Sequence, residues 1–166
     1  MENLEKAKIE VERGKEKLLA LEKEGVYVFH GTTVILDELE PKQGRNFDYK
    51  LKRMENDGEP AVVATPFAEV AIFRAIINEK NEKIEAKKGK YWSEFSNNDG
   101  KLEFVTTPEV IELAKKVKGY VYVFKRDDFE RRNSLEWRTI KSVKPIRVFE
   151  VNFNDLPEGI KLSEHI

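Results

Sequence analysis

The stretch Val26-Tyr27-Val28-Phe29-His30-Gly31-Thr32 decides the fold prediction for this chain. Its β-branched and aromatic residues directly follow Gly25, and such a run predicts a β-strand that ends near His30. The chain holds two histidines, and the other, His165, is the penultimate residue. His30 is therefore the one candidate for imidazole chemistry in the body of the chain. A histidine that only makes a local hydrogen bond is the alternative at this point.

The overall composition predicts one globular domain with a densely charged surface. A chain of 166 residues can bury roughly two-thirds of its unfolded surface in a core. Hydrophobic residues make up 40% and charged residues 37% of the chain. The formal net charge of -1 gives no overall attraction to nucleic acid or to an anionic membrane, so any site for a polyanion would have to be local.

Several common kinds of site are absent from the sequence. The chain has no cysteine, which excludes disulfides, a thiol nucleophile and thiolate metal sites. One histidine without a second at ligand spacing does not predict a metal site, and neither a P-loop, a Gly-x-Gly-x-x-Gly turn nor a Gly-x-Ser-x-Gly elbow occurs. No apolar run approaches the roughly 20 residues that span a bilayer. We therefore expect a cytoplasmic protein without a metal or a membrane partner.

Residues 2–24 have the pattern of an amphipathic helix. Apolar side chains recur at steps of three and four residues, with Gly14 in the one gap and mostly Lys and Glu elsewhere. Gly25 would end this helix. The helix would either pack on the domain or bind a partner helix. The apolar positions are Leu4, Ala7, Val11, Leu18 and Leu21.

The segment after the first strand is predicted to be mainly loop. Residues 34–39 could form one or two helical turns, which Pro41 would stop. Residues 42–60 are polar and rich in turn-forming residues, and loops of this length often act as lids or binding loops. Residues 61–64 then predict a short strand. Thr65-Pro66 supplies an N-cap and a first-turn proline for a helix over residues 67–78.

The final third of the chain is predicted to be rich in strands. The strands would cover residues 120–124, 135–140 and 146–153 and pair as antiparallel neighbours. Together with the helices they indicate an α+β fold. We expect an amino-terminal helix over 1–24, one α+β domain over 25–157, and a tail over 158–166.

Glu136 is the second unusual residue. It stands beside Trp137 at the head of a predicted strand, where a carboxylate can be partly desolvated and functional. A surface glutamate is the alternative for this residue taken alone.

Three motifs occur in an order that is informative. The first is Phe29-His30-Gly31-Thr32, and the second is a strand that leads through Ala64-Thr65-Pro66 into a helix. The third is Leu135-Glu136-Trp137, with a further strand after it. In this order, over residues 26–153, the chain resembles the ADP-ribosyltransferase superfamily, in its diphtheria-toxin and poly-ADP-ribose-polymerase branch. The resemblance implies a split β-sheet core with peripheral helices.

The resemblance implies a role for each motif in binding NAD as a co-substrate. His30, followed by Gly31 and Thr32 of the same motif, would hydrogen-bond the hydroxyls of the adenosine-side ribose. The Gly31 backbone would pair with the nicotinamide amide, which requires close approach. Glu136 would hold the nicotinamide ribose and stabilise the oxocarbenium-like state as nicotinamide leaves. The reaction would be transfer of ADP-ribose to a macromolecule.

Further residues are implied around the same pocket. Thr65 would flank it, and the loop over residues 42–60 would cover NAD, with Arg45 as a pyrophosphate partner. The second motif lacks the tyrosine that is usual in this branch, so the aromatic ring on the nicotinamide would come from Tyr49, Phe67 or Phe73. Ser134, two residues before Glu136, differs from the Glu-x-Glu pattern of arginine-modifying members. The acceptor, protein or nucleic acid, is therefore open.

Two other functions remain open on the sequence. The missing tyrosine is compatible with a catalytically inactive relative that binds a nucleotide or a protein. The basic residues between Lys125 and Arg147 could face a nucleic acid or an acidic protein, or they could protect a solvated strand edge.

Overall fold

A computed structural model describes residues 9–43, 45–48, 50–56, 58–77 and 92–164. In these residues the chain is a mixed α+β protein with three α-helices and several separate sheets, none of them a closed barrel. The helices are α1 (Lys15–Glu24), α2 (Ala68–Ile76) and α4 (Pro108–Ala114), with short 3-10 turns η1 (Arg126–Asp128) and η2 (Phe153–Asp155). The strands are β1 (Val11–Arg13), β2 (Tyr27–Thr32), β3 (Arg45–Asp48), β4 (Arg53–Asn56), β5 (Val62–Ala64), β6 (Ser93–Asn98), β7 (Lys101–Thr106), β8 (Lys118–Lys125), β9 (Glu130–Arg131), β10 (Trp137–Thr139), β11 (Arg147–Asn152) and β12 (Lys161–Leu162).

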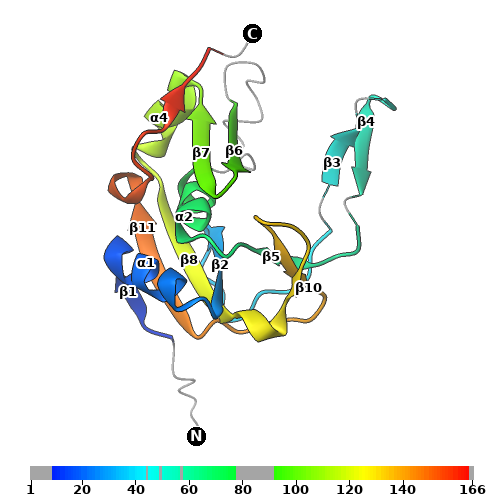
Figure 1. Cartoon of the computed structure of the whole chain (residues 1–166), viewed down its shortest axis with the longest axis vertical. Coiled ribbons are helices and arrows are strands. Elements are labelled where there is room, and N and C mark those ends of the chain that lie inside the picture. The colour runs from blue at the N-terminus through cyan, green and yellow to red at the C-terminus, as the bar shows by residue number, and fades with distance from the viewer. Residues whose placement is uncertain (1–8, 44, 49, 57, 78–91, 165–166) are drawn as a thin grey trace, which may run out of the picture.

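The largest sheet has the strand order β1-β11-β8-β2 (Figure 1). The predicted strand at Tyr27 is confirmed, and it pairs with β8 in antiparallel register from Tyr27 opposite Lys125 to Thr32 opposite Tyr120. Side chains alternate between the two faces of β2, so Phe29 faces helix α2, and His30 lies on the opposite face, where Val28 and Tyr122 are buried. The strand that carries His30 is therefore buried against packed side chains on both faces.

Helix α2 lies directly on strands β2 and β8. A Cβ atom at Gly31 would stand 2.0 Å from the Ala71 carbonyl oxygen, and one at Gly119 would stand 2.6 Å from that of Ala75. Two strand glycines therefore give the helix backbone room to approach the sheet. This packing brings the helix beside the end of β2.

A second sheet, β5-β10-β9, is joined to the first by one antiparallel bridge. The Phe29 amide donates to the Thr65 carbonyl at 2.7 Å, and the Thr65 amide donates to the Phe29 carbonyl at 2.8 Å. The large sheet thus splits at β2, and a cleft opens where β2 and β5 diverge. The expected antiparallel pairing of β8 with β11 is confirmed, but β10 pairs with β5 and β9 instead of with either of them.

Two predicted helical segments are wrong in part. The amino-terminal helix begins only at Lys15, because residues 11–13 form β1, which pairs in parallel with β11, and Gly14 between them adopts a φ of 122°. Its end at Gly25, with a φ of 72°, is as predicted, and residues 2–8 lie outside the described part of the chain. Residues 34–39 form no helix, because Leu39 makes a β-bridge to Val143.

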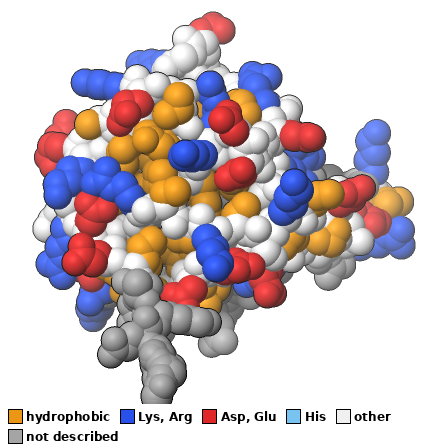
Figure 2. Space-filling view, turned by 90° about the horizontal axis from the view of Figure 1, so that it is seen from below, with side chains coloured by type: hydrophobic (Ala, Val, Ile, Leu, Met, Phe, Trp, Pro, Cys, Tyr) orange, Lys and Arg blue, Asp and Glu red, His pale blue; other side chains and the backbone are white. Residues whose placement is uncertain are grey.

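The region predicted as one long loop contains a β-hairpin. Strands β3 and β4 pair with each other and project from the body of the molecule (Figure 1). At the base of the hairpin the Gln43 side chain donates to the Gly58 carbonyl at 2.9 Å. Positively and negatively charged side chains are interspersed on the surface with hydrophobic ones between them (Figure 2), as the composition predicts. None of the described helices is long and apolar enough to cross a membrane.

Candidate functional site

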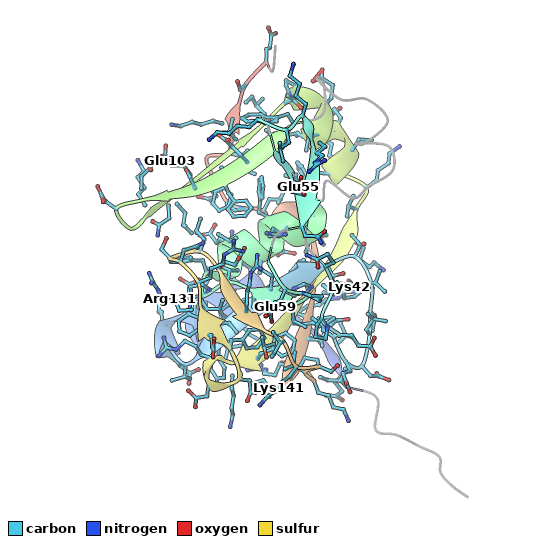
Figure 3. All side chains as sticks on the ribbon, turned by 90° about the vertical axis from the view of Figure 1, so that its right-hand side faces the viewer. Lys42, Glu55, Glu59, Glu103, Arg131 and Lys141 are labelled. Carbon is cyan, nitrogen blue, oxygen red and sulfur yellow. The ribbon has the colours of Figure 1, made fainter. Side chains whose placement is uncertain are left out.

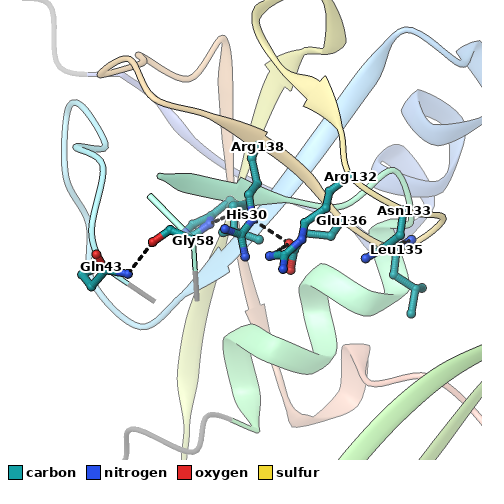
Figure 4. Close-up of polar contacts among 9 residues, drawn as sticks. His30, Gln43, Gly58, Arg132, Asn133, Leu135, Glu136 and Arg138 are labelled. Carbon is teal, nitrogen blue, oxygen red and sulfur yellow. Dashed lines mark hydrogen bonds and ion pairs between the residues drawn. The ribbon is translucent and has the colours of Figure 1, made fainter. Parts of the chain in front are cut away.

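Four residues that the sequence singled out line one cleft of about 190 Å³. His30 and Gly31 come from β2, Thr65 follows β5, and Glu136 precedes β10. The cleft lies at the split between the two sheets, with α2 on one side (Figure 4). Three segments far apart in the sequence therefore meet at one place. The other lining residues are Phe29, Val63, Ala64, Val70, Ala71, Arg74, Phe95, Asn133 and Leu135.

The His30 ring is oriented by the neighbouring strand. Its Nδ1 atom lies 2.6 Å from the Val63 carbonyl oxygen. A carbonyl oxygen can only accept, so Nδ1 carries a hydrogen. The Tyr122 ring lies beneath, with the two ring centroids 6.3 Å apart. The imidazole is thus held in one orientation at the cleft.

Glu136 is held at the head of β10 by a tight turn and two arginines. The Arg132 and Asn133 amides donate to the Glu136 carbonyl at 2.9 and 3.1 Å. Arg138 Nε donates to Glu136 Oε2 at 2.6 Å, and an Arg132 guanidinium NH donates to the same oxygen at 2.9 Å. The carboxylate is 23% exposed, and Oε1 accepts no hydrogen bond from any residue of the described part of the chain.

Arginine side chains lie in and beside the cleft. Arg74 lines it, and Arg132 and Arg138 stand on the far side of the Glu136 carboxylate. Arg132 and Arg138 are paired with this carboxylate, and Arg74 is the guanidinium group of the lining itself, which favours an anionic ligand. Within the described residues, no group of three or more His, Cys, Asp or Glu side chains could hold a metal ion.

Phe95 is the partly exposed aromatic ring of the cleft, and no pattern in the sequence predicts it there. It reaches the cleft from β6, and the Arg74 guanidinium carbon lies 5.8 Å from its ring centroid. Phe73, expected to face the ligand, is instead 1% exposed and packs on Phe104 with ring centroids 4.9 Å apart. The prediction for Phe73 is wrong because the inward face of α2 covers the β6–β7 hairpin. Phe67 packs against the same core.

The other predicted residues have different positions. Thr65 is 4% exposed, and its hydroxyl accepts from the Phe67 amide at 3.2 Å. Thr32 ends β2 outside the lining of the cleft, and its hydroxyl accepts from the Val34 amide at 3.3 Å. The backbone of Arg45 opens β3, opposite Asn56. Tyr49 lies outside the described residues.

Arg132, Arg138 and Arg74 are residues of the site that the sequence reading did not assign to it. Arg138 could have been predicted from the sequence. It follows Glu136 by two residues along an extended segment, so the two side chains lie on the same face. Arg74 and Phe95 come together at the cleft because α2 packs against β6, and no local sequence pattern predicts this packing. With this geometry in view, no family model, curated protein or solved structure is similar enough to the chain to match it.

Proposed function

We propose that the chain is an NAD-dependent transferase that moves ADP-ribose to a macromolecular acceptor. The observation that carries the proposal is the convergence of His30, Gly31, Thr65 and Glu136 on one cleft. These residues belong to the three motifs that resemble ADP-ribosyltransferases. The motifs were recognised by order in the sequence, and order alone does not require that they share a cavity.

The size and charge of the cleft support binding of one end of NAD. A cleft of about 190 Å³ is smaller than typical small-molecule sites of roughly 300–1,000 Å³. It would enclose the nicotinamide riboside end, with Phe95 as an aromatic wall, and His30 Nε2 would lie toward a hydroxyl of the adenosine-side ribose. The pyrophosphate would lie at the rim, where the guanidinium groups favour negative charge.

Glu136 would act on the bond that breaks. Its Oε1 atom would accept from the 2′-hydroxyl of the nicotinamide ribose, while its charge stabilises the oxocarbenium-like state. The bond between the nicotinamide nitrogen and ribose C1′ breaks, and its electron pair leaves with nicotinamide. An acceptor nucleophile then bonds to C1′ and releases its proton to water.

Two substitutions test this proposal. Glu136→Gln should lower nicotinamide release at least 100-fold while NAD still raises the melting temperature, because the amide keeps the shape and loses the charge. His30→Ala should weaken the NAD-induced shift. Glu112→Gln on α4, whose partner is the exposed Lys115, is the matched control and should behave as wild type. Full transfer activity in Glu136→Gln would overturn the proposed function.

A binding module without turnover is the second candidate. The ion pairs from Arg132 and Arg138 already satisfy Glu136 Oε2, as in a purely structural network. Such a protein would bind NAD or a related nucleotide and release no nicotinamide. The wild-type chain with NAD and a nicotinamide assay separates the two functions.

The nucleic-acid alternative has less support than the two functions above. Arg126 lies over the Trp137 ring, at 5.4 Å from its centroid, and Arg147 pairs with Glu12. Half of the eight basic residues from 125 to 147 therefore have partners in the protein. Arg131 and Lys141 lie on the outside (Figure 3) and are exposed. Salt-sensitive binding of a random oligonucleotide, without competition by NAD, would favour this alternative.

A further inference from the structure

The side chain of Arg138 connects the cleft carboxylate with the base of the β3–β4 hairpin. Its Nε atom donates to Glu136 Oε2 at 2.6 Å, and the side chain is 17% exposed. Residues 136 and 138 lie on the same face because side chains along an extended chain alternate. The pair is thus built by the conformation of one short segment (Figure 4), and both side chains are largely screened from water.

The other end of the guanidinium lies against Gly58. A Cβ atom at Gly58 would stand 3.1 Å from the Arg138 NH1 atom, which is closer than nearly all real contacts of a Cβ. The Gly58 carbonyl also accepts from Gln43, so the backbone there is held at the base of the hairpin. The lack of a side chain at Gly58 therefore leaves the space that the guanidinium occupies.

Arg138 also stands opposite the residue that orients His30. In the β5–β10 register, Arg138 pairs with Val63, whose carbonyl accepts the His30 hydrogen bond. The same strand pair thus fixes both His30 and the arginine on Glu136. Arg132 donates to the same carboxylate oxygen, but its side chain is 43% exposed, so water competes with this contact more strongly.

We infer that Arg138 is a positioning residue, which holds Oε2 of Glu136 so that Oε1 is presented to the cleft. The inference rests on the proposed function, because it gives the presented oxygen a substrate. The ion pair with Glu136 and the close approach to Gly58 restrict the guanidinium, and this in turn restricts rotation of the carboxylate. Misplacement of a reacting group by about 1 Å can cost roughly 100-fold in rate.

Kinetics of Arg138 variants test the role directly. Arg138→Gln should lower kcat for nicotinamide release by roughly 100-fold, while the Kd for NAD changes less than about threefold. Arg138→Lys should recover part of kcat, since an ammonium group can still pair with Oε2. Arg132→Gln should lose less than Arg138→Gln. Melting temperatures of all variants identify any loss that comes from unfolding.

A pair of glycine variants tests the same role without altering Arg138. Gly58 and Gly159 have φ angles of +70° and +75°, so alanine is similarly strained at both positions. Only Gly58→Ala meets Arg138, because a Cβ at Gly159 has no atom within 4 Å. Gly58→Ala should therefore lower kcat, and Gly159→Ala should leave it unchanged.

The outcomes distinguish a failure of the positioning role of Arg138 from a failure of the proposed transferase function. Wild-type kcat in both Arg138→Gln and Gly58→Ala overturns the positioning role and leaves the transferase proposal standing. A parallel rise in the Kd for NAD and fall in kcat in Arg138→Gln would make Arg138 a binding residue, which also overturns the role. Failure of the wild-type chain to release nicotinamide overturns the proposed function and this role with it.

Discussion

Gly31 is constrained by helix packing before any ligand is considered. Its missing side chain was interpreted as room for nicotinamide, but a Cβ there would overlap the Ala71 carbonyl and stand 2.8 Å from the Ala75 amide nitrogen. The atoms that it would meet belong to a helix backbone and cannot turn aside as a flexible side chain can. The glycine is therefore required by the fold, whether or not a ligand also uses the space.

Gly31→Ala should accordingly destabilise the protein by about 3 kcal/mol or more, because α2 must move away from β2. Gly25→Ala is the control, since Gly25 has a φ of 72° and open space around it, and its cost of about 1 kcal/mol is conformational. Urea denaturation measures both variants. Equal midpoints for the two would show that α2 yields without cost and that the packing argument is wrong.

Tyr122 fixes the segment that follows the His30 strand. Its hydroxyl donates to the Val34 carbonyl at 2.8 Å and accepts from the Leu36 amide. Burial raises the pKa of Tyr122, so the hydroxyl stays protonated and keeps both contacts at neutral pH. The exposed side chains of Val34, Ile35 and Leu36 give this segment little packing of its own.

Tyr122→Phe should cost about 1–2 kcal/mol, the usual range for the loss of hydrogen bonds at a partly buried site. Hydrogen exchange of the Leu36 amide should accelerate, while amides in the middle of β8 keep their protection. Tyr120→Phe, on the same strand, is the control for a lost phenol. An unchanged Leu36 exchange rate would contradict the anchoring role of Tyr122.

The candidate residues that can be predicted from the sequence are those whose chemistry is unusual in their setting. His30 and Glu136 could be identified because a lone histidine and a strand-head carboxylate stand out against an otherwise ordinary composition. Phe73 was assigned wrongly because an aromatic residue on an amphipathic helix does not reveal which neighbour it faces. Phe95 came from a strand that the sequence reading did not predict, so its role depends on tertiary packing alone.

At the scale of elements, the first turn of helix α2 is capped by a side chain of helix α1. The Thr65-Pro66 signal predicted a cap, but Phe67 is the N-cap residue and makes no side-chain cap. The Ala68 amide instead donates to Glu22 Oε1 of α1 at 2.6 Å. A capping group 46 positions away cannot be read from the local sequence, although the start of the helix was predicted to within one residue.

Glu22 therefore couples the two helices in a pH-dependent way. Burial is the main reason that the pKa of Glu22 is raised; the Ala68 amide partly offsets this, and the Glu69 carboxylate adds to it. Lys15 lies 3.6 Å from Glu69 on the facing surface. A raised pKa means that the folded state binds the proton more tightly than the unfolded chain. This contribution to stability is full below the usual carboxyl pKa and is lost as the pH rises through the raised value.

Two variants measure this coupling. Glu22→Gln keeps an oxygen for the Ala68 amide and carries no charge, so near neutral pH it should be at least as stable as wild type. Glu22→Ala removes the cap and should cost about 1 kcal/mol. Any advantage of Glu22→Gln over wild type should shrink as the pH falls into the acidic range, because wild-type Glu22 becomes protonated there. An advantage that grows in acid would contradict the raised pKa.

At the scale of the whole molecule, the sequence predicted the α+β class and most of the strands but not how they pair. Strand β10 was expected beside β8 and β11, yet it pairs with β5. Strands β5 and β10 belong to a second sheet, which the Phe29–Thr65 bridge joins to the first. Strand β1 could not be distinguished from the helical pattern around it, because a strand of three residues is too short to show an alternation of its own. Pairing over such distances is decided by the packed core.

The parallel pairing of β1 with β11 also brings Glu12 against Arg147, which is 135 positions away in the sequence. Two hydrogen bonds of 2.6 and 2.7 Å join the carboxylate and the guanidinium. The hydrogen bonds from Arg147 are the main reason that the pKa of Glu12 is lowered. The two side chains are 25% and 35% exposed, so solvent screens part of this attraction.

Glu12→Gln should therefore destabilise the protein by roughly 0.5–1 kcal/mol at pH 7. The lowered pKa makes this contribution full above the usual carboxyl pKa, and it is lost as the pH falls through the lowered value. The difference between wild type and variant, measured by urea denaturation, should close in acid and also in high salt. Glu10→Gln, at an exposed position beside the strand, should show no such change. A gap that persists in acid would mean that the side chain of Glu12 stabilises β1 by packing, since the protonated carboxyl and the amide differ little in shape.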